Sequence, residues 1–175
     1  GQPLLSWRVH LLPFLGHSNL YEQFRLDEPW NSEHNLGLLQ RMPEIYLTPN
    51  GDQAKGITSV LATGGQQGFL RKPPAERKGR QSMTAGVSFG NITDGTSNSL
   101  LMFDAPPEFA VEWTKPTEFI PVEGDIKKIL GRKFIGVFGD GSSYHQALVA
   151  NSSTGEVTFP SGVTGLAAPE LGTAI

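Results

Sequence analysis

Hydrophobic positions near the start of the chain recur with the spacing of a helix. Trp7, Leu11 and Leu15 lie four residues apart and form an apolar stripe. The neighbouring Leu12 widens this stripe. We therefore predict a helical segment over 6–24, capped by Ser6 and interrupted at Pro13 and Gly16. A second helix is predicted from Ser32 to Met42, and its buried side is expected to come from Leu36, Leu38 and Leu39.

The rest of the chain alternates short apolar runs with turns rich in glycine and proline, which is the pattern of short strands. The segments expected to be extended are 44–48, 57–63, 99–104, 109–113, a hairpin over 131–144 continued by 145–150, and a short edge strand within 155–160. Helices followed by strands predict an α+β fold in which the N-terminal helices pack on an antiparallel sheet.

Two segments interrupt this order. Residues 64–84 combine prolines, glycines and charges, so we predict a long exposed loop there. From residue 161 the chain is small, apolar and without periodicity, which is typical of a loosely held tail. The expected organisation is one α+β domain over 1–150 that includes the loop, followed by an irregular extension over 151–175.

Composition limits the function. The chain has 175 residues with 21 glycines and 13 prolines, which favours many turns and short elements. A formal net charge of −3 provides no basic field for nucleic acid or anionic lipid. The absence of cysteine excludes disulfides, thiolate metal sites and cysteine nucleophiles. No stretch approaches the roughly 20 apolar residues that span a bilayer.

Two Asp-Gly turns, each next to an apolar run, are the sharpest local signals in the chain. They contain Asp94 and Asp140, whose carboxylates are possible calcium ligands. Their spacing does not match an EF-hand loop, which needs several alternating oxygen ligands. The favoured interpretation is that each Asp orders its own turn through bonds to the backbone, so we expect no metal and no cofactor.

The three tryptophans are candidates for a contact surface. Trp7 lies on the apolar stripe, which favours a place in the core. Trp30 precedes the predicted cap at Ser32, where it either packs against the start of that helix or contacts a partner. Trp113 ends a strand close to Lys115 and is the best candidate for a half-exposed contact, although packing is favoured over recognition.

No pattern in the sequence matches a catalytic site. The histidines (His10, His17, His34 and His145) show no helical metal spacing, and no nucleophile or phosphate-binding motif is present. Three pairs of acids would suit glycoside hydrolysis only if the fold gave them the right separation: Asp27/Glu28, Asp104/Glu108 and Glu118/Glu123. The basic stretch 71–80 lacks interleaved aromatic residues, so we interpret it as a solvated loop.

Four blocks of the chain resemble, in order, a large planctomycete family of prepilin-type proteins. The opening LLSWRVHLLPFL is similar to the family's "LLSWRVxLLPYL", and its continuation runs to Asn35. The later blocks ITDGTSNS, AVEWTKP and FGDGSS are similar to the family's "ITDGTSNT", "AVxWTKP" and "F-x-DGS-V" at 92–99, 110–116 and 138–143. The chain departs from the family where Thr48-Pro49 replaces a frequent "CP", and again beyond Ala150.

The resemblance implies a pilin-like or pseudopilin-like head domain of unknown function, without an N-terminal methylation segment and hydrophobic helix. It implies a place in the cell envelope or periplasm, membrane anchoring through that missing helix, and protein partners or self-assembly. It implies no reaction, so we expect a structural protein and not an enzyme. The alternative is a secreted module that binds carbohydrate or another ligand on the same scaffold.

Overall fold

The computed structural model describes residues 3–64, 69–70, 92, 95–97, 99–120, 133–147, 149–150 and 157–158. The chain divides into two compact units. Unit 1 comprises Gly1–Leu61 and Ala105–Thr117, and unit 2 comprises Ala62–Asp104 and Glu118–Ile175. Short helices and antiparallel sheets make the fold α+β, as predicted.

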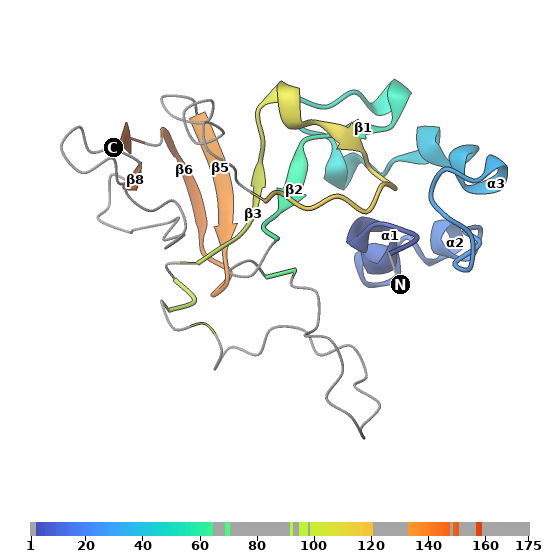
Figure 1. Ribbon diagram of the computed structural model, residues 1–175, viewed down its shortest axis with the longest axis horizontal. Helices are drawn as coiled ribbons and strands as arrows, with labels where there is room; N and C mark the ends of the chain where they lie inside the picture. Colours follow the sequence, from blue (N-terminus) through green and yellow to red (C-terminus); the bar gives the residue numbers. More distant parts are fainter. Residues whose placement is uncertain are drawn as a thin grey trace, which may run out of the picture. The chain divides into compact units, whose positions relative to one another are not determined.

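The helices of the described residues belong to unit 1 and are short (Figure 1). In chain order they are α1 (Trp7–Leu11), η1 (Leu12–Leu15), α2 (Ser18–Tyr21), α3 (Glu33–Leu36), η2 (Leu39–Arg41), η3 (Glu44–Tyr46), η4 (Gln53–Lys55) and η6 (Pro107–Phe109). The sheet of this unit pairs β1 (Ile57–Thr58) with β4 (Val111–Glu112) in antiparallel orientation.

The first helical segment begins and breaks where the sequence predicted. The Ser6 hydroxyl accepts a hydrogen bond from the Arg8 backbone amide, and Pro13 lies in the tighter 3-10 turn η1. Gly16 ends this turn with a φ of 80°. Of the predicted apolar stripe, Leu12 is buried, whereas Leu11 and Leu15 are exposed. The side chains that face the core together with Leu12 are Leu5 and Val9.

The second predicted helix is shorter than expected, and one predicted strand is wrong. The Ser32 side chain caps α3 as predicted, but Leu36 is 46% exposed while Asn35 is buried. The segment 44–48 is not extended: it forms η3, which turns the Tyr46 side chain into the core. The Tyr46 hydroxyl donates to the Arg8 carbonyl there, and this distant contact outweighs local strand propensity.

One hydrophobic cluster organises unit 1. The helices pack around Trp113, which directly follows β4, so helices and strand contribute to the same core. The buried members of this core cluster are Leu5, Val9, Leu12, Leu20, Phe24, Met42, Tyr46 and Trp113.

The four-stranded sheet has the order β2-β3-β5-β6. Its strands are β2 (Val60–Ala62), β3 (Leu100–Asp104), β5 (Lys133–Phe138) and β6 (Ser143–Ala147). The last three lie side by side in unit 2, where β5 pairs antiparallel with both neighbours (Figure 1). A further antiparallel pair joins β7 (Val149–Ala150) to β8 (Val157–Thr158).

Most strand predictions are confirmed in position. The hairpin predicted over 131–144 with its continuation corresponds to β5 and β6, and β8 lies within 155–160. The run 57–63 is divided at Ser59 into β1 and β2, and 109–113 contributes only β4. Most of the loop 64–84 and all of the tail from 161 lie outside the described residues. The division of the chain at residue 150 stays a prediction.

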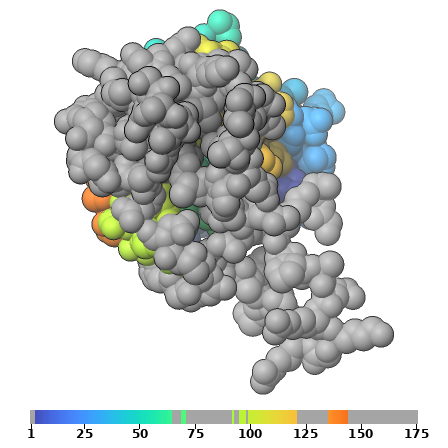
Figure 2. All heavy atoms as spheres, turned by 60° about the vertical axis from the view of Figure 1, so that its left-hand side comes forward, coloured from blue at the N-terminus to red at the C-terminus, as the bar shows by residue number. Residues whose placement is uncertain are grey.

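The turns of the two Asp-Gly motifs adjoin each other in unit 2. The Gly139 amide donates to the Ser99 carbonyl at 2.9 Å, so the β5–β6 turn meets the residues just before β3. In Figure 2 the orange segment, which contains this turn, borders the yellow-green segment at the molecular surface. A Cβ added at Gly139 would lie 3.2 Å from the Thr96 carbonyl oxygen and 2.4 Å from the Phe69 ring, so glycine fits this close contact best.

A matched pair of glycines in unit 1 tests the packing of η2 against η4. Gly16 and Gly56 both have positive φ, but an added Cβ meets nothing within 4 Å at Gly16 and lies 2.3 Å from the Leu39 carbonyl oxygen at Gly56. We expect Gly16→Ala to cost about 1–2 kcal/mol of unfolding free energy through backbone strain alone. Gly56→Ala should cost about 1–3 kcal/mol more through the clash.

Urea unfolding followed by tryptophan fluorescence measures both losses. All 3 tryptophans of the chain lie in unit 1, so the signal reports on that unit. Equal losses for the two variants would contradict the packing at Gly56.

Candidate functional site

Trp113, the main candidate for a half-exposed contact, is a core residue. Its exposed fraction is 0%, and its indole Nε1 donates to the Leu39 carbonyl at 2.8 Å. The ring stacks on Tyr46 with centroids 6.0 Å apart and meets the Phe24 ring edge to face at 5.7 Å. Packing, which the sequence favoured over recognition for this residue, is therefore confirmed. The candidate half-exposed contact is wrong, because β4 ends at Glu112 and places the next side chain among the helices.

The other two predicted binding residues lie together. The Lys115 ammonium is 5.5 Å from the centroid of the Trp30 ring and 3.7 Å from a carboxylate oxygen of Glu112. Trp30 is half-buried against the core cluster, and its backbone amide donates to the Leu4 carbonyl. A cation over an aromatic ring contributes about 0.5–1 kcal/mol at an exposed site. Of the three predicted binding residues, Trp30 and Lys115 therefore lie together in unit 1, and Trp113 is not part of this surface.

Arg8 is a buried cation that the sequence interpretation missed. Its guanidinium is 0% exposed and donates from Nε to the Val60 carbonyl at 2.9 Å and from Nη1 to the Ser6 hydroxyl at 2.9 Å. Nη2 donates to the same Val60 carbonyl, and the Trp7 ring lies 4.7 Å from Cζ. No carboxylate in the described part of the chain forms an ion pair with it.

The sequence does contain a signal for this burial. Arg8 lies three residues after Leu5 and four before Leu12, on the helix face that both leucines bury. Burial lowers the pKa of Arg8 to about 10 and raises the pKa of Tyr46 to about 12. At neutral pH the arginine is therefore charged and the phenol neutral. The guanidinium donates to Val60 and Ser6 within unit 1, so its role is to connect α1 to β2.

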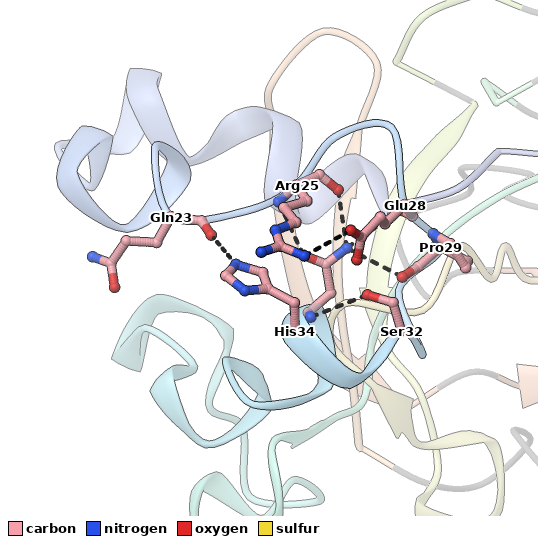
Figure 3. Close-up of polar contacts among 7 residues, drawn as sticks. Gln23, Arg25, Glu28, Pro29, Ser32 and His34 are labelled. Atoms are coloured by element: carbon pink, nitrogen blue, oxygen red, sulfur yellow. Dashed lines mark hydrogen bonds and ion pairs between the residues drawn. The ribbon is translucent and has the colours of Figure 1, made fainter.

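A loop over 25–29 is organised by the buried side chain of Asn35. Its amide nitrogen lies 3.0–3.2 Å from three backbone carbonyls, those of Arg25, Glu28 and Pro29, which share its two N–H donors. Its amide oxygen accepts from the Arg25 backbone nitrogen at 3.0 Å. Figure 3 shows this loop together with Ser32, which caps the helix that carries Asn35. One amide therefore contacts four backbone groups of the loop, two of which, the Arg25 and Pro29 carbonyls, also accept backbone hydrogen bonds from Glu28 and Ser32.

Side chains at the edge of this loop form further polar contacts. Arg25 forms an ion pair with Glu28 at 2.9 Å, and His34 Nε2 lies 2.8 Å from the Gln23 carbonyl, to which it donates (Figure 3). Hydrogen bonds from Ser32 and Arg25 hold the pKa of the Glu28 carboxyl below its usual value. In the Asp27/Glu28 pair, the Glu28 carboxylate is therefore already bonded to side chains of the loop.

The Asp140 carboxylate is used within its own turn. It accepts from the Ser142 amide at 2.9 Å and from the Ser142 hydroxyl at 2.6 Å, and these bonds lower the pKa of Asp140. This is the self-ordered turn that the sequence favoured over calcium. Asp94 lies outside the described residues, as does Glu123. Among the residues that the structure describes, no cluster of three metal-binding side chains occurs.

Comparison with protein families shows to which family the chain belongs. A family model described as "Protein of unknown function (DUF1559)" matches residues 1–165. The chain belongs to the DUF1559 family. No curated protein and no solved structure matches it.

The DUF1559 match contains both units as far as they are described, including β8 beyond residue 150. The predicted domain of unknown function is therefore confirmed at the level of the family. The family description states no reaction, ligand or partner. Among the described helices, none has the length and apolar character to cross a membrane.

Asn35→Asp tests whether the loop over 25–29 depends on this single amide. The introduced carboxylate would face three carbonyl oxygens and could donate to none of them. We expect a loss of about 3 kcal/mol or more in the free energy of unfolding at pH 7. The loss should shrink on acidification, because a protonated carboxyl can donate again.

The matched control is Asn19→Asp, an exposed position at the start of α2. Its unfolding free energy should stay within about 0.5 kcal/mol of the parent chain, as for most surface changes. If both variants behave alike in urea, Asn35 does not organise the loop.

Proposed function

We propose that this chain is the globular head of a pilin-like or pseudopilin-like protein of the cell envelope, which acts without catalysing a reaction. Its role would lie in surface assembly or in secretion-type structures. The resemblance of the blocks at 4–15 and 110–116 to prepilin-type proteins supports the proposal.

The observation that carries the proposal is the use of polar side chains inside unit 1. Arg8, Asn35 and Trp113 are all buried, and each donates to backbone carbonyls of the same unit. Buried polar groups with satisfied hydrogen bonds specify a fold and hold it in shape. This use of polar groups supports a rigid scaffold that acts through its exposed surface.

In this proposal the full protein is held in the membrane by a hydrophobic helix encoded ahead of these residues. Its partners are other envelope proteins or further copies of itself. Nucleic acid is not a partner, since a net charge of −3 does not attract a polyanion.

A secreted ligand-binding module on the same scaffold is the second candidate. The observation that favours it is the half-buried Trp30 with the Lys115 ammonium over its ring. Aromatic rings with nearby polar groups recur in binding sites. The Lys115 side chain lies over this ring, however, so Trp30 is not a bare platform for a sugar.

Fractionation of cells that make the native protein distinguishes the candidates. We expect an antibody against this chain to find it in the envelope fraction, resistant to high salt and released by detergent, because a helix of roughly 20 apolar residues holds it in lipid. A soluble cytoplasmic protein from cells of the same lysate is the control.

Recovery from the cytosol, with no hydrophobic helix encoded upstream, would contradict the proposal. Recovery from the medium, with retention on a polysaccharide column that Trp30→Ala abolishes, would favour the ligand-binding module.

A further inference from the structure

The turn between η3 and η4 contains an Asn-Gly dipeptide, Asn50-Gly51, which occurs once in the sequence. The Gly51 amide donates to the Thr48 carbonyl at 3.0 Å, which closes a turn with Pro49 at its second position. Both residues of the dipeptide belong to unit 1, and both are partly buried.

An asparagine followed by glycine is chemically labile in an unfolded chain, and asparagine is among the thermolabile residue types. The Gly51 nitrogen gives up its proton to hydroxide and attacks Cγ of the Asn50 side chain. A succinimide ring forms as the Cγ–Nδ2 bond breaks and ammonia leaves. Water then opens the ring and leaves aspartate or isoaspartate. Glycine favours ring closure, because its backbone is permissive and no side chain hinders the attack.

The fold engages both reacting groups. The Gly51 N–H is bonded to the Thr48 carbonyl, so the nitrogen must leave this bond before it can attack. The Asn50 Nδ2 donates to the Ala105 carbonyl at 3.2 Å. Ala105 is fully buried, and its own amide donates to the Ser59 carbonyl at 2.8 Å, so the acceptor is itself anchored. Ring closure therefore requires contacts of unit 1 to break first.

Packing also selects the glycine that makes this dipeptide labile. A Cβ added at Gly51 would lie 2.8 Å from the Ile57 carbonyl oxygen, a backbone atom that cannot turn aside. Ile57 is fixed in turn, because it exchanges two backbone hydrogen bonds of 2.8 Å with Asp52. We propose that Asn50-Gly51 is a deamidation site that is protected while unit 1 is closed and reacts when the unit opens.

Deamidation at this site weakens the unit. An aspartate at position 50 has no N–H to donate to the Ala105 carbonyl and brings a carboxylate oxygen toward it. Isoaspartate instead adds a methylene to the backbone of the turn. An acceptor left without its donor in a buried place destabilises the folded state. Because refolding does not restore the amide, the reaction leaves a lasting mark of past opening, wherever in the cell the protein acts.

Mass spectrometry of the whole chain tests the proposal. The chain is kept at pH 8 in buffer, or in guanidinium chloride above its unfolding transition, and is then digested with trypsin. The peptide 42–55 contains Asn50 as its only asparagine, so the conversion of amide to acid in this peptide measures the reaction. We expect the native chain to react at least about tenfold more slowly than the unfolded chain, because only the open fraction reacts.

Variants that change the stability of unit 1 test what controls the rate. Trp113→Phe removes the bond to the Leu39 carbonyl and should raise the native rate several-fold, with no change in denaturant. The matched control is Asn19→Asp, an exposed change that should react at the parent's rate. If Trp113→Phe does not fold, Gly16→Ala replaces it. Equal native and unfolded rates would overturn the proposal. So would a native rate that does not rise in a variant with a lower urea midpoint.

The effect of the product is measured with Asn50→Asp. We expect its urea midpoint to lie below that of the parent, whereas Asn19→Asp, the same chemical change at an exposed position, should keep the parent's midpoint. Equal midpoints for the two variants would overturn the inferred weakening. These outcomes are separate from the fractionation of cells, which tests the envelope role and does not depend on the chemistry of Asn50.

Discussion

Burial of the Trp113 indole is the interaction on which unit 1 depends. The ring lies between Tyr46 and Phe24, its Nε1 donates to the Leu39 carbonyl, and its backbone amide donates to the Gly56 carbonyl. These contacts join segments that are distant in sequence. A buried indole N–H needs an acceptor, so the position of η2 is fixed by a specific hydrogen bond as well as by apolar packing.

Other buried polar side chains of unit 1 also form hydrogen bonds to its backbone. The Arg8 guanidinium connects α1 to β2, and the Asn35 amide closes the loop over 25–29. Both groups donate to backbone carbonyls of unit 1. The surface of unit 1 carries the Trp30–Lys115 pair and exposed apolar side chains around Phe14.

Features set by local chemistry could be predicted from the sequence, and features set by distant contacts could not. Ser6, Ser32 and Gly16 act through hydrogen bonds or φ values within a few residues, so the helix boundaries that they set were accessible. The same holds for the hairpin of β5 and β6. The burial of Trp113 depends on helices about seventy residues away, and η3 exists because the Tyr46 hydroxyl reaches the Arg8 carbonyl. The stripe through Leu11 was misassigned because helical spacing alone does not say which face turns inward.

The central claim is tested most directly by two matched Trp→Phe substitutions in unit 1, with unfolding free energies measured in urea. Trp113→Phe removes an indole N–H bonded to the Leu39 carbonyl, whereas the Nε1 of Trp7 has no hydrogen-bond partner among the described residues. The account predicts that Trp113→Phe costs about 1–3 kcal/mol more than Trp7→Phe, since it leaves a carbonyl unpaired. Equal losses, or a larger loss for Trp7→Phe, would contradict it.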